Sequence, residues 1–253
     1  MKTNIKKFVC WNPSKDTLIA FIIGITIILL SLSMQISNNK FVSIFIRDIL
    51  MILICGIYIP LKMIDKEKKY KDFGLHVKGW YIFLPINLIL GILILNMFLK
   101  ESPLPLNFRF TNEILWQIFY IMISGVFEMI VFYSFIRTIF ERAFGIIPAI
   151  IISSIFYSFH HAGFQPEFAK LIFVGIMYAT VFRIGNSVLL IYPFFWGVGA
   201  CYDVLVKSNV VSEIINPAPR SIILIIGIGI IIGYLIFKNR MINRKSTNTQ
   251  QAV

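Results

Sequence analysis

The feature that most constrains the fold is a series of long apolar stretches separated by short polar segments. The first runs from Thr17 to Ile36, and seven more follow at roughly 43–64, 80–99, 114–136, 146–160, 168–182, 187–206 and 221–237. A helix needs about 17 to 25 residues to cross a hydrocarbon core about 30 Å thick, and only 146–160 and 168–182 are short. Hydrophobic residues make up 58% of the chain and charged residues 14%, which excludes an ordinary soluble domain. We predict an all-α, polytopic membrane helix bundle of about eight transmembrane helices.

The distribution of basic residues predicts the orientation of this bundle. With eight spans and the N-terminus inside, 17 of the 24 Lys and Arg residues fall on the cytoplasmic side, as the positive-inside rule requires. Six fall on the opposite side, namely Lys40, Lys100, Arg109, Lys170, Lys207 and Arg220, and Arg47 lies within a span. Both ends are therefore predicted to be cytoplasmic. The net charge of +12 then reflects membrane topology, and no nucleic-acid partner is expected.

The domain plan follows from the same pattern. Residues 1–16 form a cytoplasmic N-terminal segment, 17–240 form the transmembrane bundle, and the polar residues 241–253 are predicted to be a disordered cytoplasmic tail. The first stretch is a full span, longer than a signal-peptide core, so we expect it to stay in the mature protein. The cysteines, at 10, 55 and 201, are odd in number and indicate inert thiols rather than disulfides.

Ionisable residues inside a membrane helix are costly, so each one is a candidate functional residue. Arg47 and Asp48 are adjacent, and a local or inter-helix ion pair explains them. Glu128 is the only charged residue between Ile118 and Phe135, and no cation lies three or four positions away to neutralise it. His160 and His161 end the fifth stretch, and Asp203 lies in the seventh, so these positions complete the set.

Glu128 and the histidine pair together suggest water activation. A carboxylate can accept a proton from water while an imidazole orients that water or stabilises the oxyanion. The alternative is structural: Glu128 hydrogen-bonds a backbone or hydroxyl group and helps the bundle to pack, and His161 borders the outer loop as a solvated side chain. Residue counting opposes a shared site, because Glu128 lies about 21 Å below the outer start of its stretch and His160 about as far above the inner start of the next. In a core about 30 Å thick these depths differ by roughly 10 Å, so tilt, a shifted boundary or a re-entrant segment must close the gap before the pair can share a water.

Three consecutive blocks of sequence resemble a known family. The blocks are Phe-Glu-Met-Ile-Val-Phe-Tyr-Ser-Phe-Ile at 127–136, Phe-Glu-Arg-Ala-Phe-Gly at 140–145 and Ser-Ser-Ile-Phe-Tyr-Ser-Phe-His at 153–160. They resemble the CPBP family of intramembrane endopeptidases, the CAAX-protease and bacteriocin-processing group also called Abi. The resemblance implies a family core at about 113–206.

The resemblance assigns family motifs to particular residues. In the motif Glu-Glu-x-x-x-Arg, the first Glu falls on Glu128, while Met129 and Tyr133 hold the other two positions. The motif Phe-x-x-x-His is intact from Phe156 to His160. In the motif His-x-x-x-Asn or Asp, the last residue is Asp203 with Gly199 at the His position, or else Trp196 and Ala200 hold the two positions; a second motif His is absent in both alignments.

By resemblance, the chain is an intramembrane endopeptidase with Glu128 and His160 as catalytic residues and His161, Asp203 and Tyr133 as accessory ones. The implied substrate is a membrane-associated or bacteriocin-type peptide, with a role in peptide processing or bacteriocin self-immunity, and the implied location is a bacterial plasma membrane. A zinc ion held by Glu128, His160, His161 and Asp203 and a metal-free site both remain open. The missing motif residues leave a second hypothesis, a catalytically degenerate relative that binds a membrane partner. A transporter is a third, and nothing decides the oligomeric state.

Overall fold

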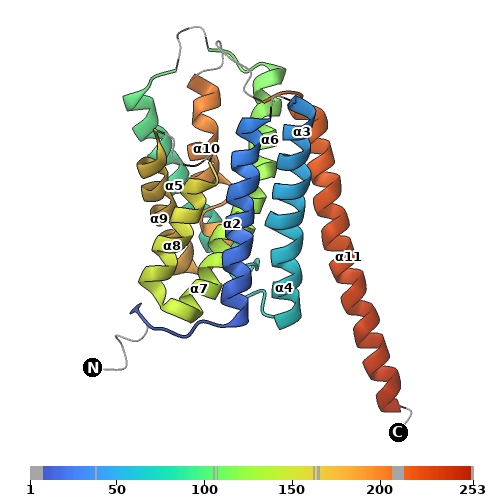
Figure 1. The fold of residues 1–253 in the computed structure, drawn as a ribbon. Coiled ribbons are helices and arrows are strands. Elements are labelled where there is room, and N and C mark those ends of the chain that lie inside the picture. Colours follow the sequence, from blue (N-terminus) through green and yellow to red (C-terminus); the bar gives the residue numbers. More distant parts are fainter. Residues whose placement is uncertain are drawn as a thin grey trace.

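The computed structural model describes residues 8–37, 39–104, 106, 108–161, 163, 166–206 and 214–251, and every regular element within them is helical (Figure 1). Side chains are described in these ranges except at 203–206 and 240–251. The elements, in chain order, are α2 (Lys15–Ile36), α3 (Lys40–Ile44), η1 (Phe45–Tyr58), α4 (Ile59–Glu67), α5 (Trp80–Glu101), α6 (Asn112–Glu128), η2 (Met129–Ile136), α7 (Arg137–Phe144), α8 (Ile146–Phe159), α9 (Phe168–Gly185), η3 (Val188–Leu190), α10 (Phe194–Val206) and α11 (Pro217–Gln251).

Six helices in the described residues are long and apolar enough to cross a membrane: 15–36, 40–67, 80–101, 112–144, 168–185 and 217–239. Two of them are composite, because α3, η1 and α4 form one continuous helix, as do α6, η2 and α7. They match six of the eight predicted stretches. The fifth stretch is the shorter helix α8, of 14 residues. The seventh is interrupted between η3 and α10, where Pro193 lacks an amide hydrogen and disfavours a helical residue before it.

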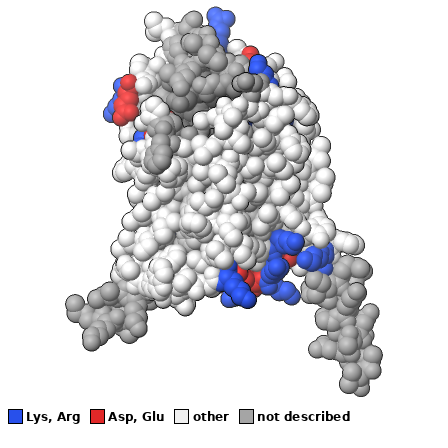
Figure 2. Space-filling model, viewed as in Figure 1, with Lys and Arg blue, Asp and Glu red and all other residues white. Residues whose placement is uncertain are grey.

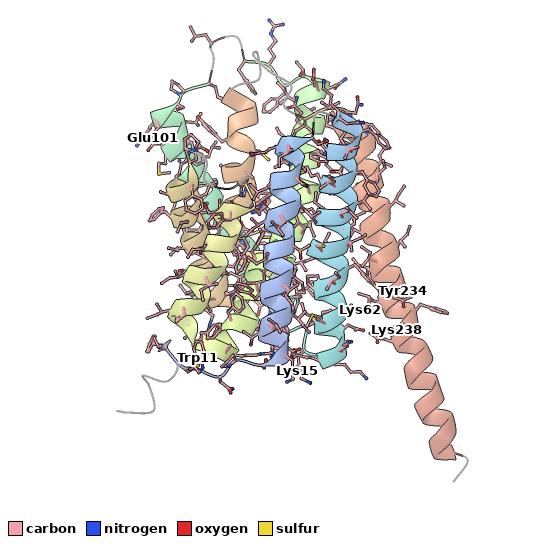
Figure 3. The ribbon with its side chains drawn as sticks, viewed as in Figure 1. Trp11, Lys15, Lys62, Glu101, Tyr234 and Lys238 are labelled. Carbon is pink, nitrogen blue, oxygen red and sulfur yellow. The ribbon has the colours of Figure 1, made fainter. Side chains whose placement is uncertain are left out.

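Charged and apolar side chains are segregated along the bundle axis. Lys15, Lys62 and Lys238 lie at one end and Glu101 lies at the other (Figure 3). Figure 2 shows a broad uncharged band between the two charged ends on the face in view. The helices α5 and α11 expose many large apolar side chains along this band, among them Leu93 (59%) and Ile230 (66%). Water would penalise so large an apolar surface, whereas lipid chains would cover it without cost, so the surface is compatible with a membrane protein.

The composite helix of α6, η2 and α7 forms the centre of the bundle. All eight residues of η2 are buried, and α2, η1, α4, α8 and α9 pack against η2 or α7. A π-helical segment makes wider turns than an α-helix, and such segments are frequent at functional sites. In this chain η2 begins directly after Glu128.

A single residue joins the central helix to α8. Gly145 has φ of +89°, a conformation that glycine adopts at little cost, and it is the only residue between α7 and α8. The chain reverses here, so α8 runs back beside the central helix. The N-terminal segment covers this end, since the amides of Cys10 and Asn12 donate hydrogen bonds to the carbonyls of Phe144 (2.9 Å) and Ala143 (2.7 Å). These bonds satisfy carbonyls that have no partner inside α7.

An inter-helix ion pair joins η1, α6 and α11 near the other end. Arg220 donates to both carboxylate oxygens of Asp48, at 2.7 and 2.8 Å, and the Tyr120 hydroxyl donates to Asp48 at 2.6 Å. The expected inter-helix ion pair of Asp48 is therefore present, with Arg220 as its partner. Arg47 instead faces the Tyr120 ring, with its guanidinium carbon 5.5 Å from the ring centre.

Replacing Asp48 by Asn should destabilise the protein by about 3–5 kcal/mol, because Arg220 would remain buried without its counter-charge. Arg47→Gln, which removes a cation one position away, should have a much smaller effect. Reversible unfolding of the purified protein in mixed micelles would measure both. Equal unfolding midpoints for the two variants would contradict the assigned pairing.

Candidate active site

Three predicted site residues converge in the middle of the bundle. Glu128 is the last residue of α6, His160 follows directly after α8, and His161 is next in the chain. His160 Nε2 lies 3.2 Å from Glu128 Oε1, and His161 Nε2 lies 3.9 Å from the same oxygen. Glu128 and His160 are buried, at 7% and 6% exposure, while a third of the His161 side chain is exposed. The sequence thus identified residues that the fold brings together.

The predicted depth difference of roughly 10 Å between Glu128 and His160 is wrong. The prediction ended the Glu128 helix near Ile136, but the helix continues through α7 to Phe144. Glu128 therefore lies 16 residues before Phe144, the last residue of α7, and His160 lies 14 residues after Ile146, the first residue of α8. At 1.5 Å per residue these are about 24 and 21 Å from the same turn, so the two side chains reach nearly the same depth.

A single backbone carbonyl orients both imidazole rings. The Nδ1 atoms of His160 and His161 both face the carbonyl oxygen of Tyr157, and the distance from His161 Nδ1 is 3.0 Å. A carbonyl only accepts, so each Nδ1 carries the hydrogen and each Nε2 of a neutral ring presents a lone pair. Both lone pairs are on the side of Glu128. The close contact between His160 and Glu128 therefore requires a proton between them or a cation shared by them.

The second carboxylate oxygen is bound by a residue that sequence reasoning did not select. Trp196 of α10 donates its indole N–H to Glu128 Oε2 at 3.0 Å, and its side chain is buried. Trp196 holds a position where one motif alignment expects a histidine. That alignment is the sequence feature that could have identified Trp196 as a site residue. The indole fits against Gly125, where a Cβ atom would lie only 1.9 Å from the ring. A glycine at this position is what allows α10 to approach α6.

The other predicted accessory residues are Tyr133 and Asp203. Tyr133 is fully buried beside Tyr157 and Tyr178, with ring centres 5.6 and 6.1 Å away, and its hydroxyl has no hydrogen-bond partner among the described residues. Asp203 belongs to α10, but its side chain lies outside the described part of the chain. At Gly199 a Cβ atom would lie 2.4 Å from the Tyr178 hydroxyl, so a histidine there would need rearrangement.

The chemistry of the donor atoms fits a divalent cation of the zinc class. Ligand atoms of Glu128, His160 and His161 all lie within 4.8 Å of one another. Zinc binds imidazole nitrogen and carboxylate oxygen at about 2.0–2.2 Å, which in a tetrahedron separates ligand atoms by roughly 3.4 Å. The shared carbonyl of Tyr157 supplies the outer hydrogen bonds that ligating histidines normally make. Three protein ligands would leave a fourth position open, as in catalytic sites.

Comparison with protein-family models, with curated proteins and with solved structures gives no match for this chain. The CPBP resemblance therefore remains a prediction that rests on the motif positions.

Gly125→Ala should lower the thermal unfolding midpoint by several degrees, although alanine normally favours a helix, because the added methyl group displaces the Trp196 ring. Gly229→Ala is the matched control, since no atom lies within 4 Å of its added Cβ. In a background where Trp196 is the only tryptophan, its emission should also shift in Gly125→Ala. Unchanged emission and an unchanged midpoint would show that the indole does not occupy this position.

Proposed function

We propose that this chain is a membrane-embedded endopeptidase of the CPBP type, with Glu128 as the base that activates water. The observation that carries the proposal is the convergence of the Glu128 carboxylate with the Nε2 atoms of His160 and His161, at 3.2 and 3.9 Å, inside an apolar bundle. A carboxylate at this depth is costly, and one carbonyl orients two histidines on it.

Each residue has a defined task in peptide hydrolysis. Glu128 Oε1 takes a proton from water as the water oxygen attacks the peptide carbonyl carbon. Trp196 holds Oε2, which fixes the orientation of the carboxylate. When the C–N bond breaks, Glu128 returns the proton to the leaving amine, so a single carboxyl group serves as base and then as acid. The buried Tyr133 hydroxyl, which has no partner among the described residues, is a donor that a bound substrate could engage.

A divalent cation would be held by the Nε2 atoms of His160 and His161 beside the Glu128 carboxylate, and when bound it would polarise the water and the substrate carbonyl. The histidines keep their Nε2 lone pairs directed at this point because Tyr157 holds their Nδ1 hydrogens. Under this proposal the imidazoles are the neutral ligands and Glu128 supplies the negative charge.

The topology and substrate belong to the same proposal. We infer eight passes, with α8 and the η3–α10 segment as short passes packed against longer helices, and both ends in the cytoplasm. Support comes from Lys15 and Lys238, which lie at the same end of the bundle (Figure 3). A plasma-membrane location, cleavage of membrane-associated or bacteriocin-type peptides, and a role in peptide processing or self-immunity follow from the resemblance alone.

A second candidate function is binding of a membrane partner without turnover. The observation that favours it is the Trp196 indole, which already occupies one of the two oxygens of Glu128. The absence of arginine at Tyr133 and of a second motif histidine points the same way. In this case the Glu128–His160 contact is a structural hydrogen bond between the central helix and α8.

Glu128→Gln should abolish cleavage of membrane peptides by the purified protein in liposomes, with a loss of at least about a hundredfold, because the amide cannot accept the proton of water. Glu113→Gln, an exposed change at the start of the same helix, should leave the rate unchanged. The measurement is product formation by mass spectrometry over a library of membrane peptides and bacteriocin precursors. If the folded wild type cuts none of them while both forms complement a deletion strain, the peptidase proposal fails and the binding function stands.

Removal of metal should stop cleavage, and added zinc should restore it, because a bound cation would polarise both the water and the substrate carbonyl. Elemental analysis of the wild type should find about one zinc per chain, and His160→Gln should lose it. Full activity after exhaustive chelation would show that Glu128 and His160 work without a metal.

A further inference from the structure

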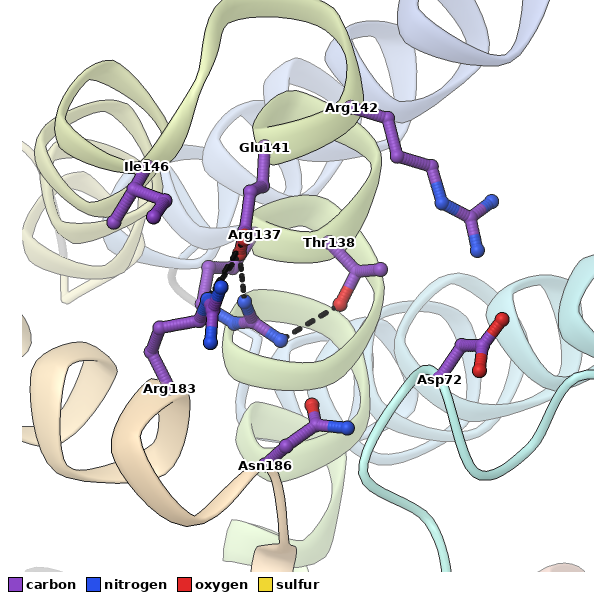
Figure 4. Close-up of a pocket in the computed structure, with 8 residues that line it drawn as sticks. All are labelled: Asp72, Arg137, Thr138, Glu141, Arg142, Ile146, Arg183 and Asn186. Atoms are coloured by element: carbon purple, nitrogen blue, oxygen red, sulfur yellow. Dashed lines mark hydrogen bonds and ion pairs between the residues drawn. The ribbon is translucent and has the colours of Figure 1, made fainter. Parts of the chain in front are cut away.

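A cavity of about 570 Å³ opens at the end of the bundle that carries Lys15 and Lys238, far from Glu128 along the central helix. Figure 4 shows its lining, which comes from α7, the start of α8, the end of α9 and the loop after α4. The lining residues are Asp72, Arg137, Thr138, Glu141, Arg142, Ile146, Arg183 and Asn186. Three guanidinium groups thus meet two carboxylates in one cavity, and nothing in the proposed peptidase chemistry uses them.

One half of this cluster forms a rigid wall. Arg137 is buried and uses its three nitrogens to contact the Tyr133 carbonyl (2.8 Å), Glu141 (2.6 Å) and Thr138 (2.8 Å). Glu141 also accepts from Nε of Arg183 with both oxygens, at 2.7 and 2.8 Å. The charge of Glu141 is therefore shared between two arginines, and the three groups together keep one positive charge.

The other half presents unused donors to the cavity. The two terminal nitrogens of Arg183 make no hydrogen bond to any described residue, and 38% of the side chain is exposed. Arg142 uses one terminal nitrogen for Glu67 and leaves Nε and the other terminal nitrogen unused within the described part. Arginine N–H groups in a fixed fork match the oxygens of a phosphate group. The attraction for an anion comes from these directed donors, since the nearby charges of Glu67 and Asp72 largely offset those of the arginines.

The level of the cavity relative to the membrane core indicates which ligands can reach it. The helix Asn112–Phe144 has 33 residues and is about 50 Å long, whereas the hydrocarbon core is about 30 Å thick. With Glu128 near the centre of the core, Glu141 and Arg142 lie about 20 Å from it, at the level of the lipid headgroups. At this level the phosphate groups of lipid headgroups lie within reach of donors directed into the cavity.

We propose that this cavity binds a phosphate ester or free phosphate through the unused terminal nitrogens of Arg183, while Arg142, on the other side of α7, adds positive charge to the lining. The proposal is independent of the chemistry at Glu128. Asp72 lines the same cavity and its carboxylate opposes an anion, so it limits the affinity. Asn186, whose side-chain amide is bonded to the Lys71 carbonyl at 3.0 Å, ties the loop after α4 to the end of α9 and keeps the cavity in shape.

The test measures binding to the full-length protein in a non-ionic detergent by calorimetric titration, with inorganic phosphate in one arm and short-chain phosphatidic acid in the other. Arg183→Gln should weaken binding about tenfold or more, since a charge-assisted donor pair is lost. Arg142→Gln should weaken it less. Lys15→Gln removes an exposed charge at the same end, outside the cavity, and should change the affinity less than about twofold.

Asp72→Asn should change the phosphate affinity in the opposite direction, which makes it the most discriminating control. It should tighten phosphate binding several-fold, because a carboxylate facing the anion is removed. Binding of the lipid alone identifies a headgroup as the source, and binding of inorganic phosphate alone identifies a soluble one. The proposal is overturned if neither probe binds, if Lys15→Gln loses as much affinity as Arg183→Gln, or if Asp72→Asn weakens binding. Arg183→Gln should fold, since Glu141 keeps its bond to Arg137, and its unfolding midpoint without ligand checks this.

Discussion

The one-residue turn at Gly145 fixes the depth at which the central helix and α8 face each other. Because the chain reverses within a single residue, side chains equally far from the turn on either side must lie at the same level. Glu128 and His160 satisfy this relation, and their contact at 3.2 Å follows from it. A longer loop would leave the register free, and a buried carboxylate without its histidine would be strongly unfavourable.

Three of the polar clusters in the described part of this apolar bundle lie at three different depths. Asp48 and Arg220 join η1 to α11 near one end, Glu128 and His160 lie in the middle, and Glu141 with its arginines lies at the other end. The two end clusters are ion pairs with strong geometry, and each links helices that are far apart in sequence. The middle cluster differs because the atoms that face one another, Glu128 Oε1 and the two Nε2 atoms, are all acceptors unless a proton or a cation is present. Chemistry is therefore assigned to the middle cluster and assembly or ligand binding to the ends.

Much of this arrangement was accessible from sequence, because lipid imposes a simple rule on helix composition. Apolar length located six long helices, and the scarcity of charge inside them singled out Glu128. The partners of buried groups were not accessible. The charge pattern places Arg220 in an outer loop, and the motif alignment shows Trp196 only as a substituted position, although both bind a buried carboxylate. Such contacts join distant segments and depend on helix register. The predicted depth of Glu128 relative to His160 was wrong because the polar residues of α7 suggested that the central helix ends before α7, whereas it ends at Phe144.

The central claim is that Glu128 and His160 interact directly across the central helix and α8. A double-mutant cycle tests it without reference to substrate or metal supply. The unfolding free energies of the wild type, Glu128→Gln, His160→Gln and the double variant would be measured in the same lipid–detergent mixture, with the metal content fixed. The structure predicts a coupling energy of about 0.5–3 kcal/mol, because either single change removes the same contact. Additive effects of the two substitutions would contradict the site.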